Sequence, residues 1–414
     1  MQQDLLRKQF KEEALYPENP KWEASIKRAY KISKNEYDIR SEFERDNNRI
    51  LHSTAYRRLK DKTQVFFATN KDHICTRIEH VNHVASIARA VSKSLGLNAD
   101  LAEAIAMGHD LGHTPFGHEG ERVLEEIVVA QGLGTIFWHE KNSLRFIDWI
   151  ETLPNYEGKQ ENLNLTYAVR DGIVCHCGEV DENFLKPRKE IVDLETMQKG
   201  KYDPYTYEGC VVKISDKIAY LGRDIEDAFE YRILRDYQIK ELKQIVENLL
   251  KKKIPLKEIN TTTLMYEFIK DLCLNSNPED GLNFSDERYL MMNQIKKFNY
   301  ENICRHKRLK PFKAYAKLIL NTIFEFLDSY YDKSFTCKKL GREAISFPTI
   351  TKDFTDWLIK YSNISLQERE RRKFHNIIIY DIDEHQQYKQ AIVDFISSMT
   401  DHYAIKVFEE IISF

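Results

Sequence analysis

The sequence HDLGHTPFGHEGE spans residues 109–121 and holds three histidines, one aspartate and two glutamates. Gly112, Pro115 and Gly117 interrupt it. Because glycine and proline end helices, we expect a helix that stops near His109 and lets neighbouring side chains converge on one point. The stretch is therefore either a buried polar cluster or a binding site at a broken helix end.

The residues before this stretch place His109 on an inner helix face. Leu101 and Ile105 precede it at helical spacing, which predicts a helix over residues 100–111. One inward histidine alone is more often part of a core than a ligand. Asp110 shifts this balance, because a buried carboxylate is costly unless it is paired or binds a metal.

A second inward histidine lies further upstream. The spacing predicts a helix over residues 79–95, in which His80 shares a stripe with the apolar residues Val84, Ile87, Val91 and Leu95. Further helices are expected over residues 118–130 and 136–151, with polar loops at 155–162 and 198–209.

A long helix is predicted over residues 211–235. One face carries the apolar residues Ile214, Ile218, Leu221 and Ile225, and the other carries Asp216, Tyr220, Arg223 and Asp227, flanked by Lys217 and Asp224. The ordinary interpretation is an amphipathic surface helix with a solvated outer face. The polar face also suits an anionic ligand that carries a sugar, and periodicity leaves both interpretations open.

These residues resemble a known family. His80, His109-Asp110 and Asp216 follow the H…HD…D pattern of the HD-domain metal-dependent phosphohydrolases, and the chain resembles their dGTPase-type branch, the deoxynucleoside triphosphate triphosphohydrolases. Six segments that follow one another between about residues 51 and 404 carry this resemblance. They are Tyr56–Leu59 with Lys62–Phe66, Thr76–His80, His109–Glu121, Phe137–His139 with Asn142–Arg145, Ser215–Tyr220 with Arg223-Asp224, and Met399–Ala404.

The resemblance implies an all-α HD-domain fold with additional C-terminal helices and at most a small strand element. Residues 377–380 form the one strand-like run. It also implies one divalent ion per active site, bound by His80, His109, Asp110 and Asp216. Mn²⁺ or Mg²⁺ suits two imidazoles and two carboxylates, with iron, nickel or zinc as alternatives.

The same resemblance implies hydrolysis of dGTP, or of dNTPs more broadly, to the deoxynucleoside and inorganic tripolyphosphate by attack of water at the α-phosphorus. The catalytic residues it implies are His118 as general acid, Glu121 to orient it, and His113 at the phosphates. The substrate-binding residues it implies are Arg77, Lys217 and His139 for the phosphates, Gln64 and Asp224 for the 3′-hydroxyl, and Tyr220 beside the sugar at C2′.

Two other classes of function stay open. Another HD phosphohydrolase, such as a nucleoside monophosphatase or an alarmone hydrolase, would share the metal motif without needing Gln64, Tyr220 and Asp224. A dNTP-sensing regulatory protein that binds nucleic acid is the second alternative. The family resemblance further implies a homo-oligomer, a hexamer or tetramer, with single-stranded DNA and an allosteric dNTP as further candidate partners. Base preference is open.

The composition of the chain further limits the class of protein and the compartment in which it is expected. The 414 residues contain only 15 Gly and 10 Pro, and 62 basic against 65 acidic side chains give a net charge of −3, which excludes a polyanion-binding surface over the whole chain. Seven scattered cysteines, no signal peptide and no membrane span indicate a cytoplasmic protein. Cys175-His176-Cys177 is interpreted as ordinary helix rather than a zinc site, and His73 and His83 as non-ligands.

We expect three regions. Residues 1–50 would form an N-terminal helical segment packed on the body, residues 51–235 the HD phosphohydrolase core, and residues 236–414 a C-terminal helical region. The last would complete the substrate pocket and provide oligomer contacts.

Overall fold

The computed structural model describes residues 9–30, 38–64, 75–134, 137–176, 183–251, 253, 255 and 260–413. The chain divides into two compact units whose segments alternate along the sequence. Unit 1 comprises Met1–Asn48, Lys71–His109 and Leu165–Lys310, and unit 2 comprises Arg49–Asn70, Asp110–Asn164 and Pro311–Phe414. The expected division at residues 50 and 235 stays a prediction.

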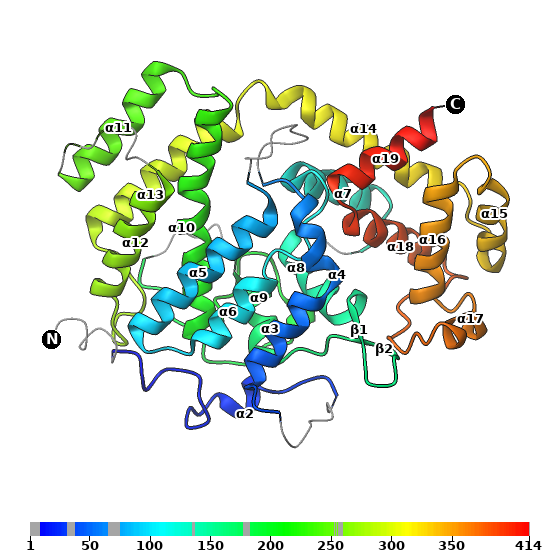
Figure 1. The fold of residues 1–414 in the computed structure, drawn as a ribbon, viewed down its shortest axis with the longest axis horizontal. Coiled ribbons are helices and arrows are strands. Elements are labelled where there is room, and N and C mark those ends of the chain that lie inside the picture. The colour runs from blue at the N-terminus through cyan, green and yellow to red at the C-terminus, as the bar shows by residue number, and fades with distance from the viewer. Residues whose placement is uncertain are drawn as a thin grey trace. The chain divides into compact units, whose positions relative to one another are not determined.

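The regular elements in the described part of unit 1 are helices and short helical turns, joined by loops. Its elements are α2 (Trp22–Ser25), most of α3 (Glu42–His52), α5 (Arg77–Leu95), α6 (Ala99–Gly108), α9 (Tyr167–Cys175), the 3-10 turn η3 (Leu194–Thr196), α10 (Tyr207–Glu230), α11 (Asp236–Leu250), α12 (Thr261–Asn275), α13 (Asp286–Asn299) and the π turn η5 (Tyr300–Cys304). Helix α10 packs against α5, α6, α9, α12 and α13, and so forms the centre of the unit (Figure 1).

Local sequence determines where α5 begins and ends. The Glu79 carboxylate accepts a hydrogen bond from the backbone N–H of Thr76 at 2.8 Å, which caps the first turn. Gly96 ends the helix with a left-handed φ of 84°. The expected apolar stripe is fully buried, so the helix predicted over residues 79–95 is confirmed with one extra half-turn at its start.

Of the two interpretations left open for the helix over residues 211–235, the solvated surface helix does not describe the polar face, which is buried or half-buried. Helix α10 runs from Tyr207 to Glu230, begins inside the loop expected at 198–209, and buries Asp224 and Asp227 as well as its apolar face. The reason is tertiary packing: α5 packs against α10 and places His80 Nε2 2.9 Å from Asp216 Oδ1. The spacing of apolar residues carries no information about a neighbouring helix that brings its own polar groups.

Unit 2 is also helical. It holds α4 (Thr54–Arg58), the 3-10 turn η1 (Leu59–Asp61), α7 (Gly117–Ala130), α8 (His139–Arg145), which continues as the π turn η2 (Phe146–Ile150), α14 (Leu309–Asp328), the 3-10 turn η6 (Lys333–Phe335), α15 (Thr336–Glu343), α16 (Pro348–Tyr361), α17 (Leu366–Arg371), α18 (His385–Ser398) and α19 (Asp401–Ile412). Helix α16 packs against α15, α17, α18 and α19, and α18 also contacts α7. The expected all-α class is confirmed.

The small strand element lies elsewhere than expected. Strands β1 (Thr152–Pro154) and β2 (Gln160–Asn162) pair antiparallel, with Thr152 opposite Asn162. The Asn155 side chain accepts from two backbone N–H groups of the connecting turn, which Gly158 completes at a φ of 75°. Residues 377–380, the expected strand, instead form one isolated bridge between Tyr380 and Ser362.

The N-terminal segment is less helical than expected. In residues 9–30 and 38–50, helix covers only Trp22–Ser25 and the part of α3 that begins at Glu42. Pro17 and Pro20 lie in the turns between Phe10 and α2, where they remove backbone donors that a helix would need. The segment is nevertheless anchored, because the buried Glu208 carboxylate accepts from the backbone N–H of Leu15 at 2.9 Å.

Candidate metal centre and active site

Three of the expected metal ligands meet inside unit 1. His80 lies in the first turn of α5, Asp216 lies on α10, and His109 follows the last residue of α6. His80 Nε2 is 2.9 Å from Asp216 Oδ1, and His109 Nε2 is 3.9 Å from the same oxygen. Both imidazoles are buried, so the three helices direct two nitrogens and a carboxylate at one small region.

The other nitrogen of His109 is held by the backbone. His109 Nδ1 lies 2.6 Å from the carbonyl oxygen of Ala106, and a carbonyl can only accept, so Nδ1 carries the proton. Nε2 then presents its lone pair toward Asp216. Metal-binding histidines are commonly fixed in this way by a backbone carbonyl, and the donor set therefore fits a divalent ion.

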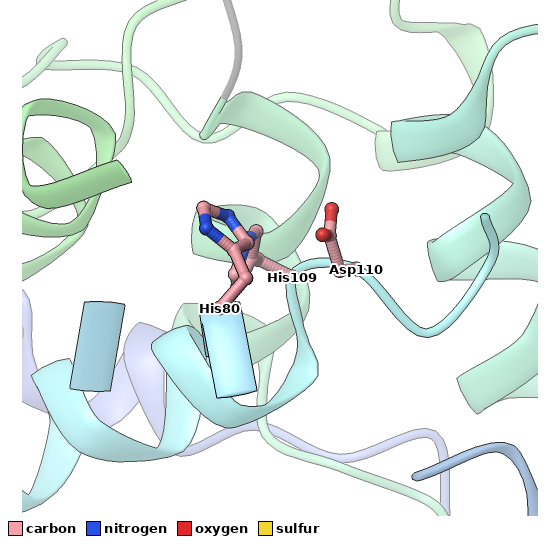
Figure 2. A group of neighbouring side chains, drawn as sticks. All are labelled: His80, His109 and Asp110. Atoms are coloured by element: carbon pink, nitrogen blue, oxygen red, sulfur yellow. The ribbon is translucent and has the colours of Figure 1, made fainter. Parts of the chain in front are cut away.

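Asp110 follows His109 directly, and its carboxylate lies close to this imidazole. Figure 2 shows the two rings and Asp110 on the adjoining turn. His80, His109 and Asp110 can each offer one ligand atom, and these atoms lie within 4.8 Å of one another. Asp110 Oδ1 is also 3.2 Å from His113 Nε2.

Asp216 is ionised in this arrangement. Burial would raise the pKa of its carboxyl, but the hydrogen bond from His80 and the nearby imidazoles of His109 and His176 hold the pKa well below its usual range. An ionised carboxylate between two imidazoles is the form that binds a cation.

The turn after Asp110 is shaped by close backbone contacts in unit 2. Phe116 adopts a left-handed φ of 67°, and its N–H donates to Asp401 Oδ1 at 2.8 Å. A Cβ on Gly120 would lie 1.8 Å from the carbonyl oxygen of Pro115, so only glycine fits there. Lys62 is buried and donates to the carbonyl of His113. These contacts fix the turn from which α7 and His118 emerge.

Glu121 joins two histidines of unit 2. Its Oε2 lies 3.2 Å from His118 Nδ1 and 3.1 Å from His139 Nδ1, and the backbone N–H of His139 donates to Oε1 at 3.2 Å. Burial raises the pKa of Glu121, but these hydrogen bonds outweigh it and hold the pKa well below its usual range. Glu121 is therefore an anion that orients both rings.

Two histidine rings of this group stack on each other. The His113 and His139 rings stack with centroids 4.1 Å apart and an interplanar angle of 22°, whereas the side chain of His118 is 71% exposed. The structure thus brings His113, His118, Glu121 and His139 together in unit 2. Only His118 of the four is largely open to solvent.

Two family models match this chain. The HD domain model covers residues 77–221, which include His80, His109, Asp110 and Asp216, and the phosphohydrolase-associated domain model covers residues 349–410, which include Asp401.

Similar full-length proteins agree with these models. The chain is 33% identical to a deoxyguanosinetriphosphate triphosphohydrolase-like protein of Caldanaerobacter subterraneus subsp. tengcongensis, over 90% of this chain and 86% of that protein. The chain belongs to the deoxyguanosinetriphosphate triphosphohydrolase-like proteins of the HD-domain family. Relatives of the same name from Desulfatibacillum aliphaticivorans (33%, 90% of this chain and 88% of the relative) and Clostridium tetani (32%, 96% and 93%) agree. The family resemblance expected from the motifs is therefore confirmed, and the protein is an HD-domain phosphohydrolase of a metal-dependent family.

Four expected substrate contacts of this HD phosphohydrolase belong to unit 1. Arg77 is buried at the start of α5, and Lys217, Tyr220 and Asp224 lie on α10 after Asp216, the first two half-buried. Burial raises the pKa of Asp224 to about 7, against opposing effects of His80 and Arg77.

Gln64 lies apart from these residues in the chain. It belongs to unit 2 and follows Thr63, whose hydroxyl donates to Asp401 Oδ2 at 2.7 Å.

One candidate site residue of this HD phosphohydrolase was not predicted from the sequence. His176, at the end of α9, is buried, and its ring centroid lies 4.8 Å from that of His109. Its Nδ1 is held by the carbonyl of Ile173 at 2.7 Å, the same arrangement that fixes His109. In the sequence, the only signal for this similarity between His176 and His109 is an inward position after a short helix. Cys177 and His73 lie outside the described residues, and Cys175 is a buried free thiol.

Within the described part of the chain, none of the helices of this HD phosphohydrolase is both long enough and apolar enough to cross a lipid bilayer.

Proposed function

We propose that the protein is a metal-dependent dNTP triphosphohydrolase. It would hydrolyse dGTP, or dNTPs more broadly, to the deoxynucleoside and inorganic tripolyphosphate. The observation that carries this proposal is the convergence of His80 and His109 on the ionised carboxylate of Asp216, with Asp110 one residue further along the chain. Two imidazoles and two carboxylates suit Mn²⁺ or Mg²⁺.

In this proposal, His80, His109, Asp110 and Asp216 hold the ion. A divalent ion there would supply a Lewis acid for the α-phosphate. Arg77 binds the α-phosphate through its planar fork of donors, and Lys217 attracts the outer phosphates as a point charge. His113 and His139 contact phosphate oxygens.

His118 completes the reaction as general acid. Water attacks the α-phosphorus and loses one proton to solvent, the bond from phosphorus to the 5′-oxygen breaks, and His118 gives a proton to that oxygen as it leaves. The anionic Glu121, which lies 3.2 Å from His118 Nδ1, supports this role because it stabilises the protonated ring and leaves Nε2 to donate.

The sugar would be recognised from α10. Tyr220 lies beside C2′, where a ribose hydroxyl would clash, and this exclusion selects deoxynucleotides. Asp224 and Gln64 contact the 3′-hydroxyl. The unusually high pKa of Asp224 supports a binding role, because perturbed carboxyls cluster at functional sites.

Product analysis tests the proposal. The protein is incubated with each of the four dNTPs and with GTP, with Mn²⁺ or Mg²⁺, and the products are separated by anion exchange. Tripolyphosphate from dNTPs and little turnover of GTP support it. Orthophosphate or pyrophosphate would instead identify another HD phosphohydrolase, and tight dNTP binding by the metal-loaded protein without turnover would identify a regulatory protein.

We also propose a homo-oligomer, a hexamer or tetramer, in keeping with the family resemblance. Light scattering on the eluting protein measures its mass directly, and a monomer at micromolar concentration contradicts this proposal. Single-stranded DNA and an allosteric dNTP are tested by adding each one to the protein. Either ligand, if it binds, should change the mass measured by light scattering or the rate of tripolyphosphate release.

A further inference from the structure

Unit 2 contains a group of side chains that can hold a metal ion and that has no such role in the function proposed above. His113, Glu121 and His139 can each offer one ligand atom, and these three atoms lie within 4.8 Å of one another. All three residues are buried. In the proposed reaction they contact phosphate oxygens or orient His118, and none of these tasks needs a cation at this group.

Two carboxylates face the same nitrogen of His139. Glu121 Oε2 is 3.1 Å from His139 Nδ1, and Glu140 Oε2 is 3.3 Å from it. A ring nitrogen carries at most one proton, so it can satisfy only one of these oxygens fully. The contact with Glu121 has the geometry of a hydrogen bond, whereas among the described residues the buried Oε2 of Glu140 has no hydrogen-bond partner.

The carboxylate of Glu140 is poorly compensated within the protein. Glu140 is 2% exposed, and in the described part of the chain no lysine or arginine lies within ion-pair distance of it. Burying a carboxylate costs free energy unless the group is hydrogen-bonded, paired or bound to a metal. Because the anionic Glu121 lies beside the same imidazole, two negative charges share one buried region, which favours a bound cation.

The donor atoms indicate which cation fits this group. Two imidazoles and a carboxylate are the protein ligands of a common class of zinc site, whereas Mg²⁺ and Ca²⁺ prefer oxygen ligands. Neighbouring ligand atoms around a tetrahedral zinc ion lie roughly 3.3–3.6 Å apart, because their bonds to the ion are about 2.0–2.2 Å long. The 3.1 Å between Glu121 Oε2 and His139 Nδ1 is close to this spacing.

The backbone holds the group together before an ion binds. Glu121 lies on α7 and His139 is the first residue of α8, and the N–H of His139 donates to Glu121 Oε1 at 3.2 Å. The imidazole of His113 stacks on that of His139, with ring centroids 4.1 Å apart. Ligands that are already in place lose little conformational entropy when they bind, and this raises affinity.

We propose that His113, Glu121 and His139 form a second cation site, which binds Zn²⁺ or a similar transition-metal ion in unit 2. The buried charge of Glu140 strengthens the binding of this ion. A single ion needs no open cavity. It reaches Glu121 past His118, whose side chain is 71% exposed and whose Nδ1 lies 3.2 Å from Glu121 Oε2.

Zinc bound at this site should inhibit the enzyme, a consequence that rests on the proposed function. Glu121 orients His118 through Oε2. An ion coordinated by that oxygen competes with His118 for it, so His118 loses its orientation and the rate falls.

Equilibrium dialysis of the full-length protein against Zn²⁺, followed by mass spectrometry of the bound metal, tests the site without turnover. His80→Ala with Asp216→Ala removes two proposed ligands of the other centre, and this double variant should still bind one Zn²⁺ per chain. Adding His139→Ala should remove that ion. Adding Glu140→Gln instead keeps the shape of the side chain but removes its charge, and should weaken binding roughly 10- to 100-fold. Glu157→Gln, an exposed change in the turn between β1 and β2, is the matched control.

Co²⁺ in place of zinc gives a second measurement. Four-coordinate cobalt absorbs visible light far more strongly than six-coordinate cobalt, so the double variant should show this absorption and should lose it when His139→Ala is added. If the double variant binds no zinc, or binds it equally well with and without the two unit 2 changes, the proposal is overturned. Glu140→Gln decides the question if the variant with His139→Ala does not fold.

Activity measurements separate this site from the proposed function. With Mn²⁺ present, added Zn²⁺ should slow the release of tripolyphosphate by the wild type, relative to its rate without zinc. Glu140→Gln should need roughly 10- to 100-fold more zinc for the same relative inhibition, which displacement of Mn²⁺ from the other centre would not require. An unchanged rate in the zinc-loaded protein overturns the inhibition. If the protein releases no tripolyphosphate at all, the proposed function fails while the dialysis result still decides the site.

Discussion

At the residue scale, Asp110 and His118 are expected to have different roles, the first in binding the metal and the second in donating a proton. Asp110→Ala removes a ligand, so metal content and activity should fall together. His118→Ala should keep the metal but lose rate, on the order of 10²–10⁴-fold for a general acid. Metal analysis by mass spectrometry and tripolyphosphate release check both variants. His52→Ala, an exposed histidine on α3, is the control. Full activity in His118→Ala would show that another group supplies the proton.

Asp224 gives a second prediction at this scale. Its pKa of about 7 in the folded protein lies above the ordinary carboxyl value, because burial disfavours the charged form. Between the two values the folded state binds the extra proton, so this group lowers stability as pH rises toward 7. Asp224→Asn should therefore be more stable than the wild type at pH 8, on the order of a few kcal/mol, and close to it at pH 4.

Urea unfolding of the metal-free protein at several pH values measures this difference. A difference between variant and wild type that does not change with pH would mean that Asp224 is not perturbed in the folded protein. Asp193→Asn, at an exposed turn, controls for the loss of a carboxylate.

At the scale of elements, Gly120 on α7 is the most constrained glycine near the site. Gly120→Ala should disturb the turn that carries His118, because the added carbon meets the backbone of Pro115, which cannot move aside as a side chain would. We expect a loss of stability of about 1–3 kcal/mol and loss of activity. Gly341→Ala, on α15 with open space around it, should instead stabilise by about 1 kcal/mol. Thermal unfolding of both variants gives the comparison.

The elements also show what the sequence could predict. Helices α5 and α7 were predicted to within two residues, because caps and apolar spacing are local. The burial of the polar face of α10 was not predicted. The contact between the rings of His176 and His109, which lie far apart in sequence, was not predicted either. Such contacts depend on how helices pack, and a single sequence pattern does not encode its partner.

At the scale of the whole molecule, the expected ligands come from segments distant in the chain. Metal binding should therefore stabilise the native protein as a whole. At 100 times its dissociation constant, Mn²⁺ should add about 2.7 kcal/mol to the free energy of unfolding. Thermal unfolding with and without Mn²⁺ measures the shift, and Asp110→Ala should abolish it. An equal shift in Asp110→Ala would place the ion elsewhere.

Asp401 has a consequence for how this protein becomes active in a cell. Its carboxylate accepts from Phe116 and Thr63, although it lies 285 and 338 residues away from them in the chain. The turn that bears His118 therefore receives this anchor only after residue 401 has been synthesised. A chain truncated before Asp401 would carry every proposed metal ligand and still lack that anchor, so we expect its proposed active site to be incomplete.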